Sequence, residues 1–134
     1  MSADILHPGH INILKIANKF GYVIVGLLTN AAIKKYKSYP ILNYNQRKIV
    51  LKSIKYVNKI IKQTTLDYVP NLKKIKPTYV IHGDDWKQGI QKKTRRDVIK
   101  VLKKWNGKLI EPKYLKNVSS SAIKKKIFIK YGSS

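Results

Sequence analysis

Three short stretches of this sequence concentrate the residue types that do chemistry: His7-Pro8-Gly9-His10, His82-Gly83-Asp84-Asp85-Trp86 and Ser119-Ser120-Ser121. The chain has only 3 histidines and 6 acidic residues. All the histidines lie in the first two stretches, and half of the acids (Asp4, Asp84 and Asp85) lie in or beside them. Packing alone does not account for such a concentration of scarce residue types, so the three stretches are candidates for one site.

The His-Pro-Gly-His stretch predicts the start of a helix, because an apolar helical pattern with Ile11 and Leu14 follows it at once. Proline suits the first helical position, where its missing N–H would have had no partner in the helix. The unpaired N–H groups and the positive dipole end of such a helix favour an anion, above all a phosphate. Ser119 to Ser121 likewise suit the N-cap of a last helix.

Helices and strands are predicted to alternate along the chain. Continuous apolar runs predict buried strands at 22–28, 57–61, 78–82 and 108–111. Helical spacing predicts a first helix that opens at the His-Pro-Gly-His stretch and ends near residue 20, and further helices at 43–54, 67–76 and 91–105. Residues 29–39 are polar and basic, typical of a loop or a short helix. This order predicts an α/β fold, a parallel sheet flanked by helices, with its ligand at the carboxyl ends of the strands.

Length and composition predict one intracellular domain. The 134 residues suit a single compact domain, taken as residues 1–131, followed by a short polar tail at 132–134. No cysteine is present, which suits a reducing cytoplasm. No apolar run approaches the roughly 20 residues that span a bilayer, and the first residues do not read as a signal peptide. We therefore expect a cytoplasmic protein that makes no membrane contact.

The net charge of +23 does not by itself indicate a nucleic-acid reader. Only Arg47, Arg95 and Arg96 are arginine, and the other basic residues are lysines spread along almost every segment. Arginine is the residue expected for bidentate contacts to guanine or phosphate. We interpret most of the lysines as a solvated surface that attracts small anionic substrates. RNA binding is the weakest hypothesis for this protein, behind the two that are described below.

The sequence resembles the cytidylyltransferases. Ser2-Ala3-Asp4-Ile5-Leu6-His7-Pro8-Gly9-His10 is similar to the stretch around their HxGH motif. Asn30, Arg47, Gly83-Asp84-Asp85-Trp86 and Ser119-Ser120-Ser121 follow in the order of that family. The resemblance looks strongest to the members of phosphonate metabolism and to glycerol-3-phosphate cytidylyltransferase. It implies a Rossmann-like nucleotidyltransferase fold, and transfer of CMP from CTP to a small phosphonate or phosphoalcohol with release of pyrophosphate.

The resemblance also implies a role for each matching residue. His7, His10 and Lys37 would be catalytic, and Lys37, Arg47 and Asn30 would bind the acceptor. Asp4 would lie on the side of a Mg²⁺ ion that arrives with the triphosphate. A homodimer, and a fusion or association with another phosphonate enzyme, are further expectations. The nucleotide-binding residues would be Ser2, Ala3, Asp4, Gly9, His10, Gly83, Asp84, Asp85, Trp86, Ser119, Ser120 and Ser121.

Two departures from the family pattern leave a second hypothesis open. Family members carry a strand before the Ser-Ala-Asp stretch, and the sequence as given lacks this first strand. Leu115-Lys116-Asn117 also replaces a Thr-Glu-Gly-like run before the serines. The alternatives are therefore a degenerate nucleotide-binding domain without turnover, or a transferase acting on glycerol 3-phosphate or ethanolamine phosphate. The acceptors that we expect first are 2-aminoethylphosphonate and 2-hydroxyethylphosphonate.

Overall fold

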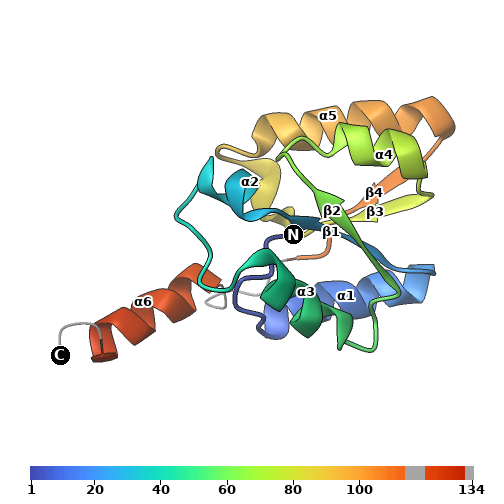
Figure 1. Ribbon diagram of the computed structural model, residues 1–134. Helices are drawn as coiled ribbons and strands as arrows, with labels where there is room; N and C mark the ends of the chain where they lie inside the picture. The colour runs from blue at the N-terminus through green and yellow to red at the C-terminus, as the bar shows by residue number, and fades with distance from the viewer. Residues whose placement is uncertain (114–119, 132–134) are drawn as a thin grey trace.

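A computed structural model describes residues 1–113 and 120–131, and its strands and helices alternate as predicted (Figure 1). The strands are β1 (Ile24–Leu28), β2 (Lys59–Gln63), β3 (Tyr79–Ile81) and β4 (Lys108–Ile110). The α-helices are α1 (Pro8–Phe20), α2 (Asn30–Lys34), α3 (Tyr44–Lys52), α4 (Val69–Ile75), α5 (Lys92–Leu102) and α6 (Ser120–Tyr131). Two 3₁₀ turns, η1 (Asp84–Lys87) and η2 (Lys103–Trp105), flank α5.

The four strands form two parallel pairs, and no strand of the described ranges joins them. β1 pairs with β2 from Ile24 opposite Lys59 onward, and β3 pairs with β4. Met1 hydrogen-bonds to the other edge of β1: its amino group donates to Gly26 O at 2.8 Å, and its carbonyl accepts from Leu28 N at 3.0 Å. The expected parallel α/β fold is confirmed, and within the described ranges its strands form two separate two-stranded sheets.

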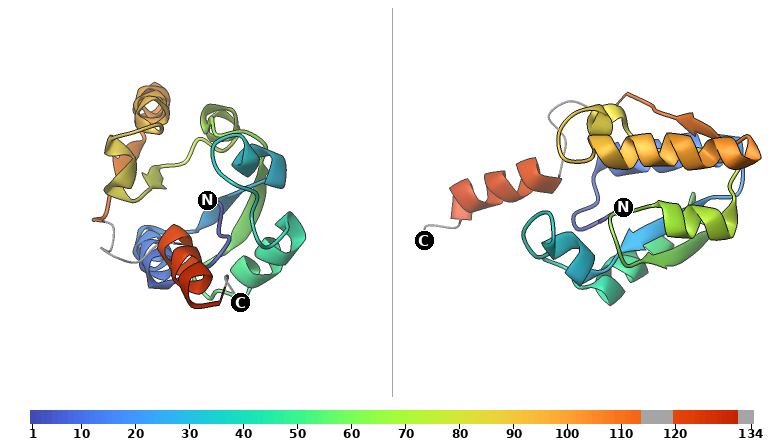
Figure 2. Two further views of the ribbon diagram at one scale, coloured as in Figure 1. Left: turned by 90° about the vertical axis from the view of Figure 1, so that its left-hand side faces the viewer. Right: turned by 90° about the horizontal axis from the view of Figure 1, so that it is seen from above.

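Helices cover both sides of the strands. In Figure 1, α4 and α5 lie above the strands and α1 and α3 below them, while α6 extends away from the body (Figures 1 and 2). One core cluster joins α1, β1 and α3 through Leu14, Leu27 and Leu51. A second joins η1 to α5 through Trp86 and Val98. No helix of the described ranges is long and apolar enough to cross a membrane.

The boundaries of two segments differ from the predicted ones, and side-chain hydrogen bonds lie at both places. The second strand was predicted at 57–61 and lies at 59–63, and Asn58 just before it bonds to Val23 at the start of the first strand. Its side-chain Oδ1 accepts from Val23 N at 2.8 Å, and its own N–H donates to Val23 O at 3.0 Å. The polar stretch 29–39 contains the short helix α2, which Thr29 caps by accepting from Ala32 N.

A partly buried carboxylate joins the second half of the fold. Glu111, just after β4, accepts from Arg95 Nε at 2.8 Å and Nη2 at 2.9 Å, and from Trp86 Nε1 at 2.8 Å. Trp86 is only 1% exposed. Hydrogen bonds from Arg95, and further from Trp86, hold the pKa of Glu111 at about 2, although burial acts to raise it. The network therefore attaches both η1 and α5 to β4.

We predict that Glu111→Gln lowers the free energy of unfolding by about 2 kcal/mol, because a neutral amide loses the charge-assisted pair. The matched control is Asp97→Asn, which removes the pair of Asp97 with Lys93, a side chain that is 77% exposed. Exposed pairs of this kind contribute about 0–1 kcal/mol. Urea unfolding of the three proteins checks the prediction, and equal losses in both variants would contradict it.

Candidate functional site

The predicted site residues gather at the carboxyl ends of the strands. In Figure 1 all four strands point toward the side where α1 begins and where α2 and η1 lie. The first two predicted stretches thus reach the same edge from different segments of the chain. This is where a parallel α/β sheet binds its ligands. Ser119 lies outside the described residues, and only the backbone of Ser120 and Ser121 is described, in the first turn of α6.

His7 and His10 cap the start of α1 with their own rings. His7 is the N-cap residue, and its Nδ1 accepts from Gly9 N at 3.0 Å. His10 completes a capping box, since its Nδ1 accepts from His7 N at 3.3 Å. An Nδ1 that accepts carries no proton, so each neutral ring holds its proton on Nε2. The ring centroids lie 4.0 Å apart, and each ring carries its N–H donor on Nε2, that of His7 being buried.

Burial keeps both rings neutral near pH 7. Burial lowers the pKa of His7. Burial, followed by the electrostatic influence of His7, the amino terminus and Lys37, lowers the pKa of His10 to about 4. A phosphate bound among His7, His10, the amino terminus and Lys37 would place a negative charge beside these groups. The electrostatics therefore suit an anion at the start of α1, as the sequence predicted.

The structure distinguishes Lys37 from the other lysines of the basic stretch. Lys34 is exposed and lies over the Tyr39 ring, 4.5 Å from its centroid. Lys37 instead is partly buried and its Nζ donates to Ser2 Oγ at 3.3 Å. Burial, and then the charge of Lys124 on α6, lower the pKa of Lys37. Two cations thus face the N-terminal loop, and Lys124 was not among the predicted residues because it stands in a run of three lysines.

Asp4 organises the loop that follows α2. Its side chain is 1% exposed, and its two oxygens accept from Ile41 N and Leu42 N, each at 2.9 Å. Lys124 also donates to it. Burial acts to raise the pKa of Asp4, but the bonds from Leu42, Lys124 and Ile41 outweigh it and hold the pKa below the usual value. Both oxygens of Asp4 are thus engaged by protein donors, and the described residues hold no cluster of three or more metal-ligating side chains, so a metal role for Asp4 stays a prediction.

Arg47 joins the loops around the site. It is fully buried at 0% exposure. Its Nη1 donates to Ser2 O and Leu28 O, both at 2.7 Å, and its Nε to Leu42 O at 3.0 Å. Its Nη2 donates to Asn30 Oδ1 at 2.7 Å. The sequence predicted substrate contacts for Arg47 and Asn30, but in this structure the two side chains bind each other and Arg47 binds protein carbonyls.

The second stretch presents its carboxylates and buries its aromatic ring. Asp85 is exposed and Asp84 partly exposed, at the start of η1. Gly83 is buried, and Trp86 belongs to the core network with Glu111. Of the four residues predicted to bind nucleotide here, the two aspartates have side chains that a ligand reaches. The Trp86 side chain instead packs in the core beneath the turn that carries the two aspartates.

Two further predicted residues contribute only backbone. Ala3 is 2% exposed and belongs to the core cluster of α1 and β1. Its φ of 52° lies in the left-handed region, so the chain turns sharply between Ser2 and Asp4. Gly9 is buried and donates its N–H to His7. Any nucleotide contact at Ala3 or Gly9 therefore involves main-chain atoms.

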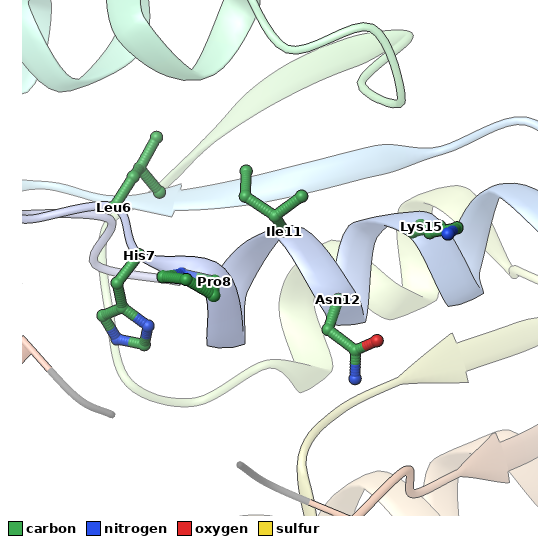
Figure 3. Close-up of a pocket in the computed structure, with 6 residues that line it drawn as sticks. All are labelled: Leu6, His7, Pro8, Ile11, Asn12 and Lys15. Atoms are coloured by element: carbon green, nitrogen blue, oxygen red, sulfur yellow. The ribbon is translucent and has the colours of Figure 1, made fainter. Parts of the chain in front are cut away.

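An open hollow of about 630 Å³ adjoins His7 (Figure 3). Leu6, Pro8 and Ile11 provide an apolar lining, and Asn12 and Lys15 add polar groups along the flank of α1. His7 is the one predicted catalytic residue among its lining residues. The hollow adjoins His7 and has room for a small molecule beside the start of α1.

Comparison with known proteins identifies the family. The family model described as cytidylyltransferase-like matches residues 2–126. This chain belongs to the cytidylyltransferase-like family. The resemblance seen in the sequence is thus confirmed at the level of the family, and the match extends from the N-terminal loop into α6.

Individual relatives in the cytidylyltransferase-like family carry two different names. The chain is 33% identical over 82 residues to an FAD synthase of Archaeoglobus fulgidus, covering 61% of this chain and 60% of that protein. It is 38% identical over 87 residues to the glycerol-3-phosphate cytidylyltransferase of Staphylococcus aureus, covering 62% and 64%. The matched part is less than two thirds of either relative.

A solved structure supports the same fold. The crystal structure of the lipopolysaccharide core biosynthesis protein from Thermoplasma volcanium GSS1 matches with a TM-score of 0.70, over 86% of this chain and 93% of that one. The identity is 24%, so the match concerns the fold alone. It is the fold expected of a cytidylyltransferase-like chain.

We predict that Arg47→Met lowers the free energy of unfolding by about 3 kcal/mol or more, because three carbonyls and one amide oxygen lose their donor. Arg96→Met is the matched control, since Arg96 is exposed on α5 and should change stability by about 0.5 kcal/mol or less. Urea unfolding measures both. A loss for Arg47→Met no greater than that of the control would contradict the role given to Arg47.

We also predict a pH dependence from His10. Its pKa is about 4 in the folded protein and about 6.5 when unfolded, so the unfolded chain binds more protons between these values. Stability should therefore fall as the pH drops from about 6.5 to about 4. His10→Asn keeps an acceptor for His7 N but does not titrate, and its stability should fall less over this range. Parallel pH profiles of the two proteins would contradict the assignment.

Proposed function

We propose that this protein is a nucleotidyltransferase that joins a nucleoside triphosphate to a small phosphorylated or phosphonate acceptor and releases pyrophosphate. The observation that carries the proposal is the His7–His10 capping box, which fixes both protons on Nε2 beside the start of α1. Lys37, Lys124 and the exposed Asp84–Asp85 turn lie at the same edge. Family membership supports this class of reaction.

The reaction needs positioning and charge stabilisation more than covalent help. An oxyanion of the acceptor attacks the α-phosphorus of the triphosphate, and the bond from that phosphorus to the oxygen bridging to the β-phosphate breaks. The bonding electrons leave with pyrophosphate. Neutral His7 and His10 would donate Nε2–H bonds to the phosphate oxygens on which charge develops. Lys37 would neutralise the triphosphate or acceptor charge, and Mg²⁺ would arrive as part of the triphosphate substrate.

CTP is the first nucleotide to test, and ATP the second. The similarity to glycerol-3-phosphate cytidylyltransferase and the Gly83–Trp86 stretch support CTP. The similarity to FAD synthases supports an adenine nucleotide, for which flavin mononucleotide would be the acceptor that AMP transfer converts to FAD. Among acceptors for CTP, glycerol 3-phosphate has the support of the Staphylococcus aureus relative. The two phosphonates and ethanolamine phosphate rest on the resemblance in the sequence, as does a homodimer.

The experiment is pyrophosphate release from CTP or ATP with Mg²⁺ and each of these acceptors. We predict that His7→Asn and His10→Asn each lower kcat about 100-fold or more, because one donor to the reacting phosphates is lost. Asparagine retains an acceptor at the position of Nδ1, so the helix cap is kept and the Nε2–H alone is removed.

The control variant is Lys19→Ala, an exposed lysine in the last turn of α1, which should leave kcat unchanged. Nucleotide binding without release of pyrophosphate for any acceptor would contradict transfer and favour the binding domain without turnover. Release that survives both asparagine substitutions would contradict the role of the histidines.

A further inference from the structure

We propose that His82 is a positioning residue, which fixes the Gly83–Asp85 loop through a single imidazole tautomer. His82 follows β3 directly and is not one of the residues predicted to contact a ligand. The proposal rests on the proposed function in one respect: the loop that His82 holds is the one expected to meet the nucleotide.

The plane of the His82 ring is set by stacking on a rigid partner. The ring lies over Trp86, with centroids 3.6 Å apart and an interplanar angle of 8°. Trp86 is itself 1% exposed and donates its indole N–H to Glu111 at 2.8 Å. Arg95 holds that carboxylate by two further bonds. The imidazole therefore rests on a surface that cannot turn without breaking the core network.

The two ring nitrogens of His82 have partners that determine where its proton lies. Nδ1 lies 2.8 Å from Gly83 O, which only accepts, so Nδ1 must carry the proton. Nε2 lies 3.3 Å from the Tyr68 hydroxyl and, in a neutral ring, accepts from it. Burial lowers the pKa of His82 and raises the pKa of Tyr68, which keeps the ring neutral and the hydroxyl protonated. Tyr68 thereby selects the tautomer that donates to Gly83.

The consequence is a loop whose Gly83–Asp84 peptide group is held on both sides. The Gly83 carbonyl accepts from His82, and the N–H of the same peptide group, that of Asp84, donates to Pro112 O at 3.2 Å. Gly83 is buried, while Asp85 is exposed. A loop fixed in this way presents its carboxylates without an ordering cost at the moment of binding. His82 acts through the loop and needs no contact with the ligand.

The test uses three variants that separate donor, ring and acceptor. His82→Asn retains an N–H at the position of Nδ1, His82→Phe retains stacking on Trp86 but has no donor, and Tyr68→Phe removes only the hydroxyl. Nitrogen NMR of the wild type should show the proton on Nδ1 of His82. Amide exchange at Asp84 and Asp85 should be about tenfold faster in His82→Phe and restored to within about threefold in His82→Asn.

Nucleotide affinity gives the functional readout, measured by calorimetry with Mg²⁺-CTP and Mg²⁺-ATP. The Kd should rise about tenfold in His82→Phe and Tyr68→Phe and at most about threefold in His82→Asn. A proton on Nε2, or equal exchange and affinity in wild type and His82→Phe, would overturn the proposal. So would a failure of His82→Asn to restore what His82→Phe loses. If the wild type binds neither nucleotide, the proposed function fails, and the tautomer and exchange data still decide the role of His82.

Discussion

The buried guanidinium of Arg47 is the interaction on which the site depends. It donates to main-chain carbonyls of Ser2, Leu28 and Leu42, three segments that are far apart in the sequence. A buried charge without a paired carboxylate is costly, and it persists because each of these oxygens would otherwise be unsatisfied as well. The N-terminal loop, the end of β1 and the loop before α3 are thus fixed to one another. His7 and Lys37 lie on or beside these fixed segments, so their positions follow from Arg47.

The same bonds that start α1 also prepare its chemistry. A serine or an aspartate would cap a helix as well as a histidine does, but neither would leave a second nitrogen with a proton. By accepting at Nδ1, His7 and His10 stabilise the helix and fix their tautomer in one step. The second half of the fold repeats this logic, because Tyr68 and Trp86 determine both the plane and the tautomer of His82. In both halves, the hydrogen bonds that form the local structure also determine the tautomers of the histidines.

The sequence predicted those features that local patterns control. The order of elements, the helix start at Pro8 and the meeting of the first two stretches at one edge all follow from periodicity and from the rules of parallel sheets. The roles of Arg47 and Trp86 could not be predicted in this way. No local pattern shows that the Arg47 guanidinium donates to distant carbonyls, or that the Trp86 indole bonds to a carboxylate 25 residues away. The shift of β2 depended on the Asn58 side chain bonding to Val23. Asp4 illustrates the same limit, because its amide partners come from a loop whose position depends on the folded chain.

The high positive charge makes location the decisive question, because +23 on 134 residues attracts any nucleotide to much of the surface. The most direct test is an NMR titration of the protein with Mg²⁺-CTP and Mg²⁺-ATP at physiological salt. We expect saturable shifts at the imidazole nitrogens of His7 and His10 and at the amides of Ser2, Gly9 and Asp84. Shifts that spread over the exposed lysines and vanish with added salt, while both histidines stay unchanged, would contradict this expectation.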